Sequence, residues 1–296
     1  MSNKTKINIV NYLLQMKRNG RAESTIKRHN QLLTQLSKLC DLNNPEEVKE
    51  TLANFKWQTN TKRATANILN TYYKFLKIPF EKPTYAKEHK LPFIPTEQEI
   101  DLIIASGTPR TATRLQLLKE TGARTGEIDH LEWTHIDTAR KTIYITAEKG
   151  SNSRILPISN KLIAMLNRLP RENNKVFQTP ADNFRKTFHF LRRRITKKLH
   201  NPRLKKIHLH TFRHFKGTTE YHKTKDIMHV KRVLGHKSIE STILYINIES
   251  SIYLTNSDEW TCKATTNTNE ATQLIENGFE YVTTTPDKLM LFRKRK

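Results

Sequence analysis

The sequence predicts a mainly α-helical protein with a small β component, divided into a helical N-terminal domain and a mixed α/β second domain. Three observations favour this fold class. Apolar residues recur at helical spacing through the first 78 residues, as in amphipathic helices. Residues 79–95 contain four prolines and no periodicity, which is typical of an interdomain linker. Beyond them, one pair of short β-rich runs lies among further helical segments. A chain of 296 residues is long enough for two domains with a real hydrophobic core.

The first domain, residues 1–78, is expected to be a compact bundle of four short helices. The clearest start is at Asn44 and Pro45, because asparagine caps a helix N-terminus and proline fits its first turn. The periodic segments that predict the other helices are 7–17 (ending at Asn19-Gly20), the segment opened by Ser24, and about 61–76 (ending before Pro79).

The second domain is expected to cover residues 96–257. Thr96 and Glu99 form a capping box that predicts the start of its first helix. The β-rich runs 142–146 and 154–158 flank a turn-rich connection and predict a hairpin with one wet face. Further helices are predicted at 183–199, 211–222, 226–234 and 238–247.

The C-terminal tail, residues 258–296, differs from the rest of the chain in its predicted secondary structure. Residues 270–275 predict a short helix, and residues 279–283 and 289–292 predict two strands joined across Pro286-Asp287. We therefore expect a short helix plus a hairpin in this tail.

The charge of the chain is strongly positive, because 52 Lys and Arg against 28 Asp and Glu give a formal net charge of +24. Such a charge favours a polyanionic partner, and nucleic acid is the first candidate. Residues 1–90 carry +10 and residues 91–257 carry +14, whereas the tail is neutral. The positive charge is densest between Asp182 and Glu220, where 37 positions hold twelve Lys or Arg, five His and no acidic residue. We expect the two domains to hold DNA and the tail to contact protein.

The residues expected to contact DNA are basic residues of the predicted helices. They are Arg185, Lys186, Arg192, Arg193, Arg194, Lys197 and Lys198 in the second domain, and Lys27, Arg28, Lys62 and Arg63 in the first. A phosphate backbone docks against such surfaces without its sequence being read, and the binding weakens steeply with salt.

Composition disfavours other classes of protein. The mean hydropathy is -0.69, and no 18-residue apolar run predicts a membrane-spanning helix. The first residues lack the apolar stretch and cleavage site of a signal peptide. Cys40 and Cys262 are too few for a disulfide framework or a four-thiolate zinc site, and are expected to be inert thiols in a reducing cytoplasm.

Arg124 is a candidate phosphate ligand because of its local context. Gly122 is expected to end one helix, so that Arg124 stands at the start of the next. There its guanidinium adds to backbone N–H groups that suit a phosphate. Glu127 lies one helical turn later and is placed to hold the arginine.

Lys149 is a candidate general acid, because the turn of a hairpin can project its ammonium group into a bound DNA groove. Lys141 and Arg154 are the local alternatives for that role.

A histidine-rich motif, H-T-F-R-H, supplies His210, Arg213 and His214. A histidine and an arginine three residues apart on a helix share one face, so both can reach one phosphate. A metal site is the competing interpretation, because His208 is close by. The motif lacks the glutamate of H-E-x-x-H, and no carboxylate is near in sequence, so we expect no metal ligands here.

Leu234-Gly235-His236 follows as a helix that ends in glycine with a histidine just beyond, and Tyr245 comes nine residues after that histidine. Taken alone, this tyrosine is an ordinary core residue. In order, spacing and residue type, however, the pieces over residues 96–250 resemble the catalytic domain of the tyrosine recombinases, the phage integrase family. The matching residues are Arg124, Lys149, His210, Arg213, His236 and Tyr245.

The resemblance extends, more weakly, to the rest of the chain. The four N-terminal helices are similar to the family's core-binding domain, and the tail is similar to those of integrases from archaeal mobile elements.

The resemblance implies a site-specific recombinase, most simply the integrase of a mobile element or virus. Tyr245 would attack a DNA phosphodiester to form a 3′-phosphotyrosine, with Arg124 and Arg213 on the phosphate and Lys149 protonating the leaving 5′-oxygen. His210 would take the tyrosine proton and His236 would bond the phosphate. Neither ATP nor a metal or other cofactor would be needed. The active assembly would be a homotetramer on double-stranded DNA, passing through a four-way junction, in the cytoplasm near the host nucleoid and without a membrane partner.

Three other functions remain open on the sequence. A type IB topoisomerase uses similar chemistry, a non-catalytic DNA-binding regulator would explain the charge alone, and a metal nuclease would need divalent ions.

Overall fold

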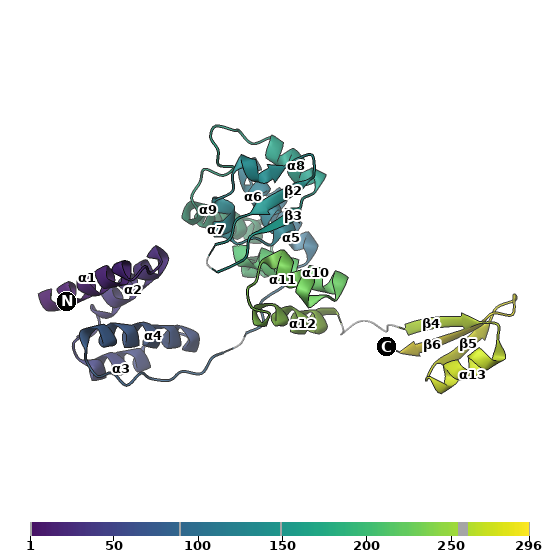
Figure 1. Cartoon of the computed structure of the whole chain (residues 1–296), viewed down its shortest axis with the longest axis horizontal. Coiled ribbons are helices and arrows are strands. Elements are labelled where there is room, and N and C mark those ends of the chain that lie inside the picture. The colour runs from purple at the N-terminus through teal and green to yellow at the C-terminus, as the bar shows by residue number, and fades with distance from the viewer. Residues whose placement is uncertain (1, 89, 149, 254–259, 296) are drawn as a thin grey trace. The chain divides into compact units, whose positions relative to one another are not determined.

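The computed structural model describes residues 2–88, 90–148, 150–253 and 260–295 (Figure 1). It divides into two compact units, Met1–Lys90 and Leu91–Lys296. Among the described residues, every helix is too short or too polar to traverse a lipid bilayer.

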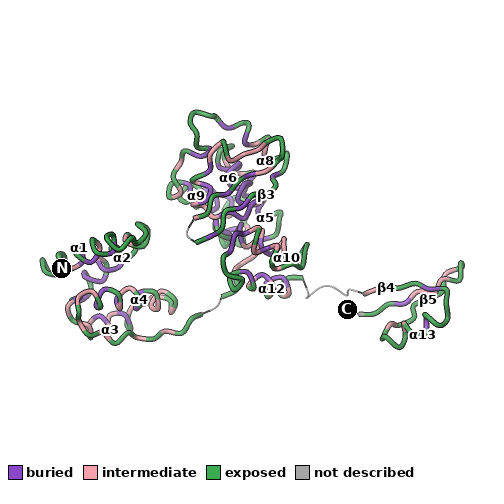
Figure 2. Tube along the Cα trace, in the orientation of Figure 1, coloured by how far each residue is buried: buried purple, intermediate pink, exposed green. Residues whose placement is uncertain are grey.

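The first unit is a bundle of four helices around one core. Tyr12, Leu33, Leu69 and Tyr72 lie at its centre and are at most 2% exposed, so the apolar stripes expected from the sequence meet inside the bundle (Figure 2). The helices are α1 (Asn3–Arg18), α2 (Glu23–Leu36), α3 (Pro45–Asn54) and α4 (Thr59–Leu76).

The helix starts of this unit differ in their capping. The side chain of Asn44 accepts hydrogen bonds from the backbone N–H groups of Glu46 and Glu47, and Pro45 occupies the first turn of α3, as predicted. The second helix begins one residue before Ser24, and its N-cap, Ala22, makes no side-chain cap.

The predicted linker, residues 79–95, packs on both units. Phe80 stacks on Tyr73 with ring centroids 4.5 Å apart, so the first residues of this stretch belong to the N-terminal bundle. Phe93 and Ile94 instead pack against the apolar clusters of the second unit.

The main body of the second unit, residues 91–253, is helical around a small antiparallel sheet of order β1-β2-β3. Ile143 and Ile145 of the middle strand are buried and Tyr144 is exposed, which gives the sheet the predicted single wet face. The strand β1 was not anticipated, because two residues carry no periodicity. The strands are β1 (Ile136–Asp137), β2 (Thr142–Ile145) and β3 (Arg154–Pro157).

Helices surround this sheet and enclose one large core that includes Leu115, Leu162 and Phe212. Figure 1 and the contacts show α10 packed against α6, α11 and α12. The helices are α5 (Glu97–Ala105), α6 (Pro109–Thr121), α7 (Thr125–Asp129), η1 (Trp133–His135), α8 (Asn160–Asn167), α9 (Ala181–Lys198), η2 (Pro202–Lys206), α10 (Leu209–Thr224), α11 (Ile227–Leu234) and α12 (Glu240–Tyr253).

The C-terminal residues 260–295 form a helix and a three-stranded antiparallel sheet of order β4-β6-β5. The helix and the β5–β6 pair lie where the sequence predicts a helix and a hairpin. The strand β4 was missed, since its residues Thr261–Thr265 are mostly polar and exposed. The elements are β4 (Trp260–Thr265), α13 (Thr268–Glu276), β5 (Glu280–Thr284) and β6 (Met290–Arg295).

Replacing Asn44 with alanine should destabilise the start of α3 by about 1 kcal/mol, because two backbone N–H groups lose their acceptor. Amide hydrogen exchange in α3 of the full chain measures this loss. The variant Asn44→Asp keeps the acceptor and should exchange like the unmodified chain. Equal exchange in Asn44→Ala and Asn44→Asp would show that the cap contributes nothing.

Candidate active site

Arg124 stands at the junction of two helices, as the sequence predicts. Gly122 ends α6 in the left-handed conformation with φ 60°, and a side chain there would approach Leu234 Cδ2 to 2.8 Å. Arg124 is then the residue before α7. The guanidinium of Arg124 remains partly accessible, with 29% of its side chain exposed.

The carboxylate of Glu127 is the centre of this part of the site. Its Oε2 accepts hydrogen bonds from the backbone N–H of Arg124 and from Nη2 of Arg154, both at 2.8 Å. Its Oε1 accepts from Oγ of Ser151 at 2.7 Å and from the Arg124 guanidinium at 3.2 Å. Glu127 is 1% exposed. Burial by itself raises the pKa of a carboxyl, but the hydrogen bonds and charge of Arg154, with the bonds from Ser151 and Arg124, outweigh it and lower the pKa to about 2.

Lys149 lies outside the described residues, but the structure shows how the residues just after it are held. Ser151 bonds Glu127, and Asn152 donates its backbone N–H to the carbonyl oxygen of Gly235 at 2.9 Å. A side chain at Gly235 would meet Asn152 O at 2.7 Å, and the residue has φ 68°, so glycine is required there. Arg154, one of the two alternatives to Lys149, is buried against Glu127.

Arg213 is buried in α10 with 2% exposure. It donates to the carbonyl oxygen of Gly122 at 2.8 Å and to that of Leu234 at 2.6 Å. Burial, and then repulsion from Arg124, lower the pKa of Arg213 to about 10, so the guanidinium stays charged at neutral pH. Arg213 therefore presents a fixed cation next to Arg124.

The two histidines of the same motif pack edge to face, with ring centroids of His210 and His214 4.8 Å apart. Burial, followed by the charge of Arg213, lowers the pKa of His210. Burial, followed by the charges of His210 and Arg213, lowers the pKa of His214 to about 4. Both are neutral at pH 7 and can accept a proton.

His236 is 7% exposed, and its Nδ1 lies 2.9 Å from Oγ1 of Thr242. Burial, followed by the charges of Arg213 and Arg124, lowers the pKa of His236 to about 3. Its ring lies nearly parallel to that of Tyr245, with centroids 6.4 Å apart.

Tyr245 is 2% exposed and sits against α10. A side chain at Gly217 would approach Cζ of its ring to 2.5 Å, so this glycine makes the space for the tyrosine. The hydroxyl lies 3.4 Å from Nδ1 of His214. Burial raises the pKa of Tyr245 to about 12, although Arg213 and Arg124 act in the opposite direction. The structure thus brings Arg124, His210, Arg213, His236 and Tyr245 to one place.

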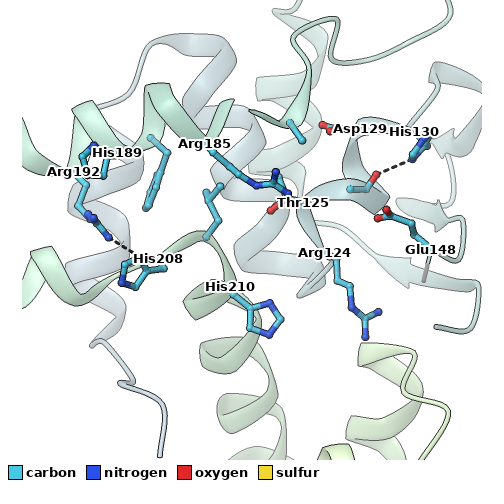
Figure 3. A pocket seen from close by; sticks show the side chains of 14 residues that line it. Arg124, Thr125, Asp129, His130, Glu148, Arg185, His189, Arg192, His208 and His210 are labelled. Atoms are coloured by element: carbon cyan, nitrogen blue, oxygen red, sulfur yellow. Dashed lines mark hydrogen bonds between the residues drawn. The ribbon is translucent and has the colours of Figure 1, made fainter. Parts of the chain in front are cut away.

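A cavity of about 600 Å³ opens beside this cluster. Figure 3 shows basic side chains reaching it from different parts of the chain. Arg185, His189 and Arg192 are on α9, His208 and His210 are at the start of α10, and Arg124 precedes α7. Sequence reasoning missed His189 and His208 as site residues, although their place in the acid-free stretch was a signal. Among the described residues, no group of three or more His, Cys, Asp or Glu is arranged to hold a metal ion.

The residues expected to contact DNA are distributed unevenly. Lys186, Arg193, Lys197 and Lys198 are exposed on α9, as are Lys27 and Arg28 on α2, whereas Lys62 and Arg63 on α4 are half-buried. Arg185 pairs with Asp182, Arg194 donates to the carbonyl oxygen of Ser106, and Lys62 donates to that of Ala53. Arg192 is buried and bonds the carbonyl oxygen of Ile207 and Nδ1 of His208. Its position makes it a support for the start of α10.

The chain is similar in sequence to known proteins. The family model described as the phage integrase family matches residues 95–251, more than half of the chain. A tyrosine recombinase of Thermosipho africanus is 27% identical over an alignment of 196 residues, and the match covers 61% of this chain and 69% of that protein. Tyrosine recombinase XerC of Pediococcus pentosaceus is 27% identical over an alignment of 213 residues, and the match covers 61% of this chain and 68% of that protein.

Solved structures share the fold. Lambda integrase bound to DNA matches with a TM-score of 0.65 at 12% identity, covering 86% of this chain and 99% of that chain. The Tn1549 transposon integrase in complex with transposon right end DNA matches with a TM-score of 0.62 at 15% identity, covering 83% and 99%. The predicted mainly α-helical fold class with small sheets is confirmed.

Replacing Glu127 with glutamine should lower the free energy of unfolding by about 3–5 kcal/mol, because Arg154 is left buried without its counter-charge. Urea unfolding at pH 7 measures the loss. Glu276→Gln, an exposed carboxyl on α13, is the matched control and should change stability by less than about 0.5 kcal/mol.

The same pair of variants has a defined pH dependence. The folded pKa of Glu127, about 2, lies below its ordinary value of 4.5, so its contribution is complete above pH 4.5 and is lost as the pH falls towards 2. The gap in stability between the unmodified chain and Glu127→Gln should narrow by up to about 3 kcal/mol over that window. A gap independent of pH would show that the carboxylate is not held by these bonds.

Proposed function

This chain belongs to the phage integrase family and is a tyrosine recombinase, and on that premise we propose that it recombines DNA at specific sites through a covalent 3′-phosphotyrosine intermediate. The observation that carries the proposal is the meeting of two arginines, three histidines and a tyrosine in one basic site, from residues up to 121 positions apart in sequence. DNA is the proposed partner, because the net charge of +24 favours a polyanion.

Arg124 and Arg213 are assigned to the non-bridging oxygens of the target phosphodiester. Negative charge builds on these oxygens in the transition state, and guanidinium groups bind them bidentately while staying charged. Two backbone carbonyl oxygens fix the guanidinium of Arg213. An ion pair with Glu127 holds the guanidinium of Arg124. A site whose cations are already oriented need not reorganise when the charge develops.

Tyr245 is assigned as the nucleophile. Its oxygen forms a bond to phosphorus as the bond from phosphorus to the 5′-oxygen breaks, and the phosphotyrosine keeps the energy of the phosphodiester for rejoining without ATP. Since the pKa of Tyr245 is about 12 in the buried position, its proton needs an acceptor. The distance of 3.4 Å between its hydroxyl and Nδ1 of His214 favours His214 for that role over His210, to which the sequence assigned it. We assign His210, which lines the cavity, to the phosphate.

The leaving 5′-oxygen requires a proton, and Lys149 is its proposed donor. The loop that carries Lys149 is tied on one side to Glu127 through Ser151 and to Gly235 through Asn152. A positioned acid of this kind contributes about 10²–10⁴-fold in rate. His236 is assigned to a hydrogen bond with the phosphate. With these cations in place, we propose that cleavage uses no metal ion.

Attack of a second 5′-hydroxyl on the adduct exchanges strands. Two such exchanges through a four-way junction complete recombination, and we propose a homotetramer on two duplex sites as the active assembly. The main body of the second unit and the N-terminal bundle supply the charge that holds each duplex. The neutral C-terminal residues are assigned to protein contact.

Replacing Tyr245 with phenylalanine should abolish the covalent adduct with a nicked suicide DNA site, because no nucleophilic oxygen remains. Denaturing gel electrophoresis of the trapped complex measures it, and Tyr253→Phe, eight residues later on α12, is the control that keeps forming the adduct. An adduct in Tyr245→Phe that is lost in Tyr253→Phe would overturn the assignment. DNA cleavage in EDTA is expected to be unchanged, whereas loss of cleavage in EDTA would favour a metal nuclease.

The same assay distinguishes the remaining alternatives. DNA binding without cleavage at any site would favour a regulator, and relaxation of supercoils without junction resolution would favour a type IB topoisomerase.

Removing Arg193 and Lys197 together should weaken DNA binding and reduce the slope of log K against log salt by about 1.8, because each phosphate contact contributes about 0.9. Both are exposed on α9 and lie outside the cavity lining. The double variant Lys161→Ala, Arg168→Ala removes the same charge from around α8 and should leave the slope unchanged. Fluorescence anisotropy at several salt concentrations measures both, and equal slopes in the two variants would show that α9 does not contact phosphates.

A further inference from the structure

Thr242 makes a buried contact with the active-site histidine that the mechanism above does not use. It lies in the first turn of α12, six residues after His236, and is fully buried. Its Oγ1 is 2.9 Å from Nδ1 of His236, which is itself 7% exposed. A hydrogen bond at this distance between two buried groups fixes the ring in one orientation.

The direction of this hydrogen bond follows from the other acceptors within reach. Thr113 and Thr121 donate their hydroxyl hydrogens to the carbonyl oxygens four residues earlier, at 2.8 and 2.7 Å. Among the described residues, Thr242 has no such carbonyl partner, and Nδ1 of His236 is the acceptor that its hydroxyl meets. Donation to Nδ1 satisfies the hydroxyl hydrogen, whereas the opposite direction would leave it without an acceptor among the described residues.

The surroundings keep the His236 ring neutral. The charged groups that act on it are Arg213, Arg124 and Arg154, with His210 in addition, and together with burial they disfavour an imidazolium. A neutral ring whose Nδ1 accepts a hydrogen bond carries its single hydrogen on Nε2. An Nε2–H among arginines is a donor suited to an anion that the same arginines attract.

We propose that Thr242 is a positioning residue that fixes the tautomer of His236, so that Nε2 donates a hydrogen bond to a non-bridging oxygen of the target phosphodiester. Thr242 also lies one helical turn before Tyr245, so the seating of α12 sets the donor and the nucleophile together. The proposal rests on the proposed function, because it is that function which places a phosphodiester in the site.

The kinetic test compares Thr242→Val, which removes the hydroxyl at nearly constant volume, with Thr242→Ser, which keeps it. Thr242→Val should slow single-turnover adduct formation on a suicide DNA site by about 10- to 100-fold, below or near the 10²–10³-fold typical of deleting a transition-state donor. The Kd for that DNA should stay within about twofold, since neither side chain carries charge. Thr242→Ser should react within about threefold of the unmodified chain. Equal rates in Thr242→Val and the unmodified chain would overturn the proposal.

A double-mutant comparison separates this role from simple support of α12. If Thr242 acts through the ring, Thr242→Val should cause no further loss of rate in a His236→Leu background. A full additional loss there would assign Thr242 to packing alone and overturn the proposal.

A second readout needs no DNA. Two-bond ¹H–¹⁵N correlation spectra of the histidine-labelled chain should show His236 as the Nε2–H tautomer, and Thr242→Val should give a mixture of tautomers. An Nδ1–H tautomer in the unmodified chain would refute the proposal even if cleavage is normal. Conversely, a chain with the expected tautomer and no covalent adduct would refute the proposed function and leave the assignment of Thr242 standing.

Discussion

The buried carboxylate of Glu127 is the interaction on which the rest of the site depends. A charge with 1% exposure is stable only when it is paired and fully hydrogen-bonded. Glu127 meets that requirement with bonds from Arg124, Ser151 and Arg154, which belong to a helix start, a hairpin loop and a strand. These bonds offset the cost of burying the carboxylate and fix Arg124 relative to the hairpin loop. Separating these elements would leave Arg154 as an isolated buried cation, which is energetically costly.

Arg213 is a buried cation that is held by backbone carbonyl oxygens. Its guanidinium donates to the carbonyl oxygens of Gly122 and Leu234, at the ends of α6 and α11. The last carbonyls of a helix lack partners within it and carry partial negative charge. The glycines Gly122 and Gly235 end these helices in the left-handed conformation, which turns the chain away and leaves the carbonyls open to the arginine. The C-terminal ends of α6 and α11 therefore lie together in the site, and Arg213 on α10 binds both.

Tyr245, the proposed nucleophile, is buried in this structure. Tyr245 packs on the bare backbone at Gly217 and is almost fully buried, and this burial raises the pKa of its hydroxyl. Burial holds the oxygen near His214 and the arginines but disfavours the phenolate that attacks. The same arginines would also attract a bound phosphodiester. The charge of the site would therefore act on both the tyrosine and the DNA.

The sequence by itself determined most of the elements and several residues of the candidate site. Helical periodicity and capping residues such as Asn44 and Thr96 set where helices begin, because they act within one turn. The order of Arg124, His210, Arg213, His236 and Tyr245 was enough to predict which residues meet. Contacts between distant segments were decided only by the tertiary structure: that Arg154 pairs with Glu127, that Arg192 is buried under His208, and that His214 lies nearest the Tyr245 hydroxyl. Local sequence patterns report the spacing of residues along one element. These contacts depend instead on how α9, α10, α12 and the hairpin pack, and turning one helix about its axis by one residue would bring different side chains together.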